Sequence, residues 1–209
     1  MDSAGIYIKA STILRNGIIL KDGTVVLRSD EKGVAFLNEA YDQLTIDYPR
    51  FYKMDVLSKM GTIAADLLLK DRFDPAAYQP HEVGMVLSNR NASIEADAQY
   101  WQASLEYPSP ALFVYTLPNI VIGEVSIRYH FKGENAFFVS DTFDAEWMHW
   151  YVTDLMNRNL LKACICGWID VFEDQLDTCL FLIAPAPSET DTTFTAENLK
   201  SIYNKSYGK

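Results

Sequence analysis

Apolar residues along this chain recur with two different spacings, one typical of buried strands and one typical of helices. Residues 136–140 and 163–171 are short, continuous apolar runs of the kind found in strands that are covered on both faces. A helical stripe lies between them, with its members four residues apart: Phe143, Trp147, Tyr151 and Leu155. The pattern predicts a strand–helix–strand unit over residues 133–170.

The junction between the first of these strands and the helix contains Ser140, Asp141 and Thr142. Each has a side-chain oxygen that can accept a hydrogen bond from the first turn of a helix, so each is a candidate N-cap. The free N–H groups and the dipole of a helix N-terminus favour an anion or a nucleophile of lowered pKa. The residue expected there is Thr142, whose hydroxyl is a weak nucleophile unless a base lies beside it.

The rest of the chain alternates segments of the two kinds. Strands are expected at residues 6–13, 18–20, 24–27, 83–87 and 179–184, and helices at 34–44, 55–70, 93–101 and 196–203. Residues 119–129 alternate like a strand, but the pair Pro118-Asn119 also suits a helix start, and the pattern alone leaves both open. Because the clearest strands are continuous apolar runs, we expect an α/β sheet in one domain over residues 1–209.

Charge and composition exclude several classes of function. The net charge of −10 disfavours nucleic-acid binding, which needs a basic surface. No apolar run approaches the roughly 18 residues of a membrane span, and the first residues lack the apolar core of a secretory signal. The odd number of cysteines, three, suits a reducing compartment, so we expect a cytoplasmic protein.

Several short motifs occur in an order that resembles a known family. In chain order they are Met54-Asp55, Val83-Gly84, Thr116-Leu117-Pro118-Asn119, Gly123, Gly133 and Gly167. Over roughly residues 6–171, this ordered set resembles the N-terminal half of the β-ketoacyl-acyl-carrier-protein synthases. The resemblance implies a thiolase-like half, with a mixed five-stranded sheet and helices on both faces. It also implies that residues 119–129 form a helix at or near a dimer interface.

The chain departs from that family at positions that carry its chemistry. In an active ketosynthase a cysteine begins the helix after the strand that follows a Gly-Pro pair, and counting from Gly133 to Gly167 without a gap puts Thr142 at that position. Glu134 replaces the proline of that pair, and Trp168 replaces the second glycine of a later Gly-Gly pair. The catalytic histidines of the family come from a second half that this chain largely lacks. The resemblance therefore implies a truncated, catalytically inactive relative with no confident catalytic residue.

For function, the resemblance implies an accessory or partner subunit in fatty-acid, aryl-polyene or polyketide-type synthesis. The expected partners are an acyl carrier protein, a full-length ketosynthase or both, in a homodimer or heterodimer. We expect no cofactor or metal of its own, apart from the 4′-phosphopantetheine that a carrier protein would present. The interface candidates are Asn119, Gly123, Phe137, Phe138 and Trp147.

A run of basic residues in the middle of the chain is either a solvated helix face or a surface for an acidic carrier protein: Arg50, Lys53, Lys59, Lys70 and Arg72. Asp66 is interpreted as solvated helix charge beside Lys70, which lies four residues further on.

Two other functions stay open. The first is a thioester hydrolase or acyltransferase that uses Thr142 or Ser140 and needs a base within about 3 Å of the hydroxyl. His149 is seven residues beyond Thr142, too far for a direct hydrogen bond. The second is a self-associating, non-catalytic binding domain. The cysteines Cys164, Cys166 and Cys179 are interpreted as buried apolar residues, because no fourth ligand follows at a suitable spacing.

Overall fold

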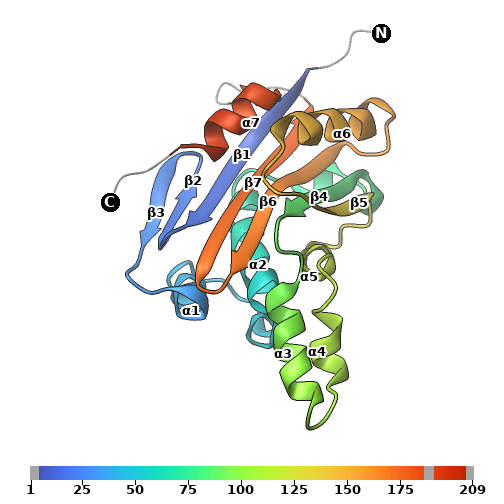
Figure 1. The fold of residues 1–209 in the computed structure, drawn as a ribbon. Helices are drawn as coiled ribbons and strands as arrows, with labels where there is room; N and C mark the ends of the chain where they lie inside the picture. Colours follow the sequence, from blue (N-terminus) through green and yellow to red (C-terminus); the bar gives the residue numbers. More distant parts are fainter. Residues whose placement is uncertain (1–4, 186–190, 206–209) are drawn as a thin grey trace.

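A computed structural model describes residues 5–185 and 191–205 of the chain; the rest of the expected domain lies outside the described residues. In the part that the structure describes, eight strands form one sheet. Their bounds are Ile6–Arg15 (β1), Ile18–Lys21 (β2), Thr24–Arg28 (β3), Val83–Asn89 (β4), Asn135–Val139 (β5), Ala163–Phe172 (β6), Gln175–Pro185 (β7) and Thr192–Thr193 (β8). Figure 1 labels strands β1 to β7 of that sheet.

Seven α-helices accompany the sheet in the described part of the chain. Their bounds are Gly33–Gln43 (α1), Val56–Leu69 (α2), Ile94–Ser104 (α3), Pro110–Val114 (α4), Ile120–Tyr129 (α5), Ala145–Asn157 (α6) and Ala196–Tyr203 (α7). The segment that the sequence pattern left open is therefore a helix, α5, as the resemblance implied.

The sheet is mixed, with the strand order β3-β2-β1-β7-β6-β4-β5, and β8 pairs with β1. Strand β6 runs parallel to β4, and β4 runs parallel to β5. Strand β7 lies between β1 and β6 and is antiparallel to both. The C-terminal ends of these three parallel strands therefore lie at the same end of the sheet. The junction between β5 and α6 lies there too.

The expected number of five strands is wrong, because the β2–β3 hairpin continues the sheet beyond β1 and β8 adds a short strand beside it. Two tight turns make this extension possible. Asn16-Gly17 and Asp22-Gly23 have positive φ angles of 53° and 72°, and of 50° and 79°. Such Asn-Gly and Asp-Gly turns match the twist of the strands that they join.

Helices cover both faces of the sheet, as expected. Buried side chains of α1, α2 and α5 pack on one face, and those of α6 and α7 pack on the other. Successive residues of β6 alternate between the two clusters, so that Ile165 joins the first and Cys166 the second. Helices α3 and α4 form a pair that extends away from the sheet (Figure 1).

Candidate functional site

The junction between β5 and α6 differs from the sequence-based expectation at the point where the helix begins. Helix α6 starts at Ala145, and its N-cap is Asp144, whose carboxylate accepts a 2.9 Å hydrogen bond from the backbone N–H of Trp147. The prediction that Ser140, Asp141 or Thr142 caps the helix is therefore wrong. Thr142 lies in the connecting loop, three residues before the helix, and is exposed.

Neither hydroxyl at this junction forms a hydrogen bond with a basic side chain in the described part of the chain. The hydroxyl of Ser140 donates to the carbonyl oxygen of Thr142, over 3.0 Å. His149 lies elsewhere, with its ring 5.0 Å from that of Phe194. A threonine hydroxyl without a base stays protonated at neutral pH, so the arrangement does not supply an activated oxygen nucleophile.

Aromatic rings pack beside this junction. The ring of Phe143 lies 4.9 Å from that of Tyr203 and 6.2 Å from that of Phe181, measured between centroids. Trp168, on β6, is buried at 6.5 Å from Phe143. Trp168, the residue that replaces the second glycine of the family's Gly-Gly pair, therefore lies inside an aromatic cluster.

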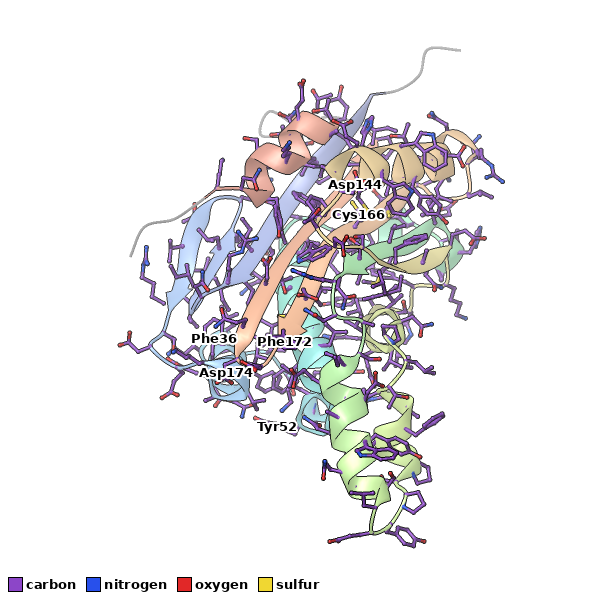
Figure 2. The ribbon with its side chains drawn as sticks, viewed as in Figure 1. Phe36, Tyr52, Asp144, Cys166, Phe172 and Asp174 are labelled. Atoms are coloured by element: carbon purple, nitrogen blue, oxygen red, sulfur yellow. The ribbon has the colours of Figure 1, made fainter. Side chains whose placement is uncertain are left out.

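The three cysteines lie within the sheet, and Figure 2 labels Cys166 on the side that α6 covers. All three thiols are free and buried. Burial raises the pKa of Cys164 to about 12 and also raises the pKa values of Cys166 and Cys179 above their ordinary values. A protonated thiol is neither a good nucleophile nor a metal ligand, and no group of three or more potential metal ligands occurs among the described residues.

Strand β5 is the edge of the sheet nearest this junction. At its two ends, the N–H of Met85 donates to the carbonyl oxygen of Glu134, and the N–H of Ser140 donates to that of Asn89. Backbone groups alternate in direction along a strand, so the N–H and C=O groups of Asn135, Phe137 and Val139 point away from β4. Strand β4 is the only pairing partner of β5 in the described part of the sheet, so this outward edge is open.

The side chains of β5 pack on both faces of the sheet. Phe137 contacts the cluster under α2 and α5, and Phe138 contacts the cluster under α6. Phe138 and Trp147 make an edge-to-face pair with centroids 4.3 Å apart. These three interface candidates are half-buried, but Val139 and Trp150 beside them are 59% and 62% exposed. Sequence reasoning missed those two residues, because a periodic pattern does not distinguish a covered apolar side chain from an open one.

Helix α5 places the other two interface candidates. Asn119, at its N-terminus, is exposed. A Cβ atom added at Gly123 would meet no atom within 4 Å, so the outer side of the helix is open there. Ile127, four residues after Gly123 and therefore on the same side of the helix, is also exposed.

The five basic residues do not form one surface. Arg50 and Lys53 precede α2, whereas Lys70 and Arg72 follow it, about 21 Å away at 1.5 Å per residue. Lys59 is buried, with its ammonium group 5.2 Å from the centre of the Phe51 ring. Burial lowers its pKa, and the negative charge of Asp55 partly opposes that shift. A continuous basic surface for an acidic carrier protein is therefore not present at this helix.

No protein-family model and no curated protein matches the chain. Solved structures do. The ishigamide ketosynthase/chain length factor superposes with a TM-score of 0.64 at 16% identity, over 88% of this chain and 63% of the other. AntDE:AntF, a type II PKS acyl-carrier protein in complex with its ketosynthase, gives a TM-score of 0.62 at 13% identity, over 87% and 63%. The ketosynthase ApeO in complex with its chain length factor ApeC, from Xenorhabdus doucetiae, gives 0.55 at 9% identity, over 88% and 80%.

These likenesses confirm the fold that the ordered motifs implied, and the chain has a ketosynthase-like thiolase fold. It spans 63% of the length of the first two structures. In the residues that the structure describes, no helix is both long enough and apolar enough to cross a membrane.

Proposed function

We propose that this chain is a non-catalytic partner subunit of a full-length ketosynthase in acyl-carrier-dependent synthesis. The observation that carries the proposal is the open edge of β5, where Asn135, Phe137 and Val139 direct their backbone groups away from the sheet. An open edge next to exposed apolar side chains is a template for pairing with a strand of another chain. The exposed side of α5 beside Gly123 would continue that contact surface.

Two further observations support a partner role over a catalytic one. Among the described residues, the hydroxyls of Ser140 and Thr142 form no hydrogen bond with a basic side chain. The structures with similar folds include a ketosynthase/chain length factor and a ketosynthase in complex with its chain length factor. A subunit that supplies a surface and no nucleophile is consistent with both.

The test uses an edge variant that leaves the fold of β5 intact. Val139 is exposed, and its N–H points outward, so Val139→Pro removes one outward donor without breaking a β4–β5 hydrogen bond. Val139→Ala keeps that N–H and is the matched control. Both variants would be mixed with the full-length ketosynthase encoded in the same genome. We expect Val139→Pro to weaken binding at least tenfold and Val139→Ala to weaken it much less, because only the proline removes the outward N–H.

Three results would contradict the proposal. One is equal binding by Val139→Pro, Val139→Ala and the unaltered chain. Another is that the unaltered chain binds no ketosynthase and instead forms a stable homodimer in sedimentation, which would favour the self-associating domain. Condensation or thioester hydrolysis by the purified chain, lost in Thr142→Ala, would instead show that the junction is catalytic.

A further inference from the structure

The helix pair α3–α4, with the residues that lead to it and from it (residues 91–117, called the arm below), exposes several large apolar side chains. Trp101, Leu105 and Tyr107 are 63%, 64% and 80% exposed. Ala96 is the one buried residue of helix α3, and helix α4 has none. Figures 1 and 2 show the arm extending from the body, with its side chains pointing outward on more than one side. Several large apolar side chains exposed on one protruding segment are typical of an interaction surface.

Hydrogen bonds fix the end of the arm that joins the body of the protein. The hydroxyl of Ser93, where the arm begins, donates over 2.7 Å to the carbonyl oxygen of Thr116, where it ends. The hydroxyl of Tyr115 donates over 3.2 Å to the buried carboxylate of Glu124 on α5. That carboxylate also forms an ion pair with Arg50, over 3.2 Å. The two ends of the arm are therefore tied to each other and to the body.

A second group of bonds fixes the loop that enters the arm. The carboxylate of Asp170, near the end of β6, accepts hydrogen bonds of 3.0 Å from the backbone N–H groups of Arg90 and Asn91. The carboxylate of Glu95 accepts a 2.6 Å bond from the N–H of Glu173 in the β6–β7 turn. The arm is therefore preorganised, because the end that joins the body is fixed by these hydrogen bonds. Such an arm loses little conformational entropy when a partner covers its apolar side chains.

The charge of the arm restricts what that partner can be. No lysine, arginine or histidine occurs between Arg90 and Arg128, whereas Glu95, Asp97 and Glu106 all lie on the arm. The chain as a whole has a net charge of −10. Arm-to-arm contact between two copies would bring like charges together, and an acidic carrier protein would meet the same repulsion. A groove that is apolar inside and basic at its rim has no such penalty.

We propose that the arm docks into an apolar groove with a basic rim on a different protein chain. The proposal rests on the proposed function, in which that chain is the full-length ketosynthase, and it assigns the contact to a surface separate from the β5 edge. Apolar side chains supply the affinity in such a contact, and the acidic residues between them orient the approach.

The experiment measures binding of the full-length ketosynthase from the same genome at about 50 and 300 mM NaCl. The double variant Trp101→Ser/Leu105→Ser removes two exposed apolar side chains, and we expect at least tenfold weaker binding at both salt concentrations. Glu106→Lys reverses one exposed charge. It should weaken binding severalfold at low salt and much less at high salt, where exposed charges are screened.

Matched controls lie at the opposite edge of the sheet and in an exposed loop. Val26→Ser removes an exposed apolar side chain on β3, and Glu31→Lys reverses an exposed charge between β3 and α1. Both should bind as the unaltered chain does. Because all the altered side chains are exposed, their urea midpoints should agree with that of the unaltered chain, which separates lost binding from lost folding.

The outcomes separate the two proposals. If the arm variants bind as tightly as the controls while Val139→Pro does not, the arm proposal is overturned and the partner role stands. If the unaltered chain binds no ketosynthase, both are overturned. If the arm variants change the sedimentation of the chain alone, a second copy covers the arm, and the proposal of a different chain is wrong.

Discussion

Asp144 illustrates how one side chain sets the start of a helix. Four of the five residues from 140 to 144 have suitable oxygens, and only Phe143 does not. Asp144 has an extended backbone, with φ −93° and ψ 94°, and its carboxylate reaches the N–H of Trp147. The hydroxyl of Ser140 is used within the loop instead. The choice of cap follows from backbone conformation, which side-chain chemistry alone does not determine.

Replacing the cap tests this assignment directly. We expect Asp144→Ala to lower the free energy of unfolding by about 1 kcal/mol, because the first turn of α6 loses an acceptor. Thr142→Ala should change it by less than about 0.5 kcal/mol, because the side chain is exposed in the loop. Urea titrations of both variants, followed by circular dichroism, provide the measurement. A larger loss in Thr142→Ala than in Asp144→Ala would contradict the assignment.

Interpretations of single residues failed where the burial of a side chain depends on contacts with distant parts of the chain. The period of four in residues 143–155 was sufficient to predict α6, because core contacts repeat with the helix. Apolar spacing did not reveal that Lys59 on α2 is buried or that Trp150 on α6 is exposed. Whether a side chain is buried depends on which residues from distant parts of the chain pack against it. The spacing of apolar residues along the sequence does not contain that information.

Between elements, the clearest link joins α2 to α5. The carboxylate of Asp66 on α2 accepts hydrogen bonds of 2.6 Å from Nε and Nη2 of Arg128, and it also accepts one from the hydroxyl of Tyr129. The sequence-based interpretation of Asp66 as solvated charge beside Lys70 is therefore wrong. A partner four residues away is visible in the sequence, whereas a partner on another helix appears only once the two helices are packed together.

This link predicts a loss of stability at high pH. Burial, together with the nearby charge of Asp66, raises the pKa of Tyr129 well above its ordinary value. In the unfolded chain, tyrosine releases its proton near pH 10, while the folded chain still holds it. Stabilisation is therefore complete below about pH 10 and is lost as the pH rises beyond it.

Urea titrations at pH 8, 10 and 11 test the effect, with Tyr129→Phe as the variant that cannot ionise. We expect the unaltered chain to lose stability faster above pH 10 than Tyr129→Phe does. Some loss will remain in the variant, because burial also raises the pKa of Tyr203 and of Tyr115. Equal slopes for the two proteins would show that Tyr129 does not retain its proton in the folded state.

At the scale of the whole molecule, β6 and β7 connect the two halves of the core. Alternate residues of these strands enter opposite clusters: Ile169 and Leu180 join the cluster under α2, and Cys166 and Phe181 join the cluster under α6. The continuous apolar runs of both strands already indicated burial on two faces. The alternating layers were therefore predictable. The two strands of the β2–β3 hairpin were predicted as well. Their position as an extension of the sheet beyond β1 and the direction of the arm were not, because these depend on pairing and exposure.

Because the two clusters share these strands, we expect the described chain to unfold as one cooperative unit. Met60, on α2, and Met148, on α6, are fully buried on opposite faces. Met60→Ala and Met148→Ala should each cost about 2–5 kcal/mol. Hydrogen exchange at rising urea concentration reports α2 and α6 separately, and each variant should shift both helices to the same lower midpoint. If Met60→Ala shifted α2 and left α6 unchanged, the two faces would unfold independently, and the strands between them would not couple the layers.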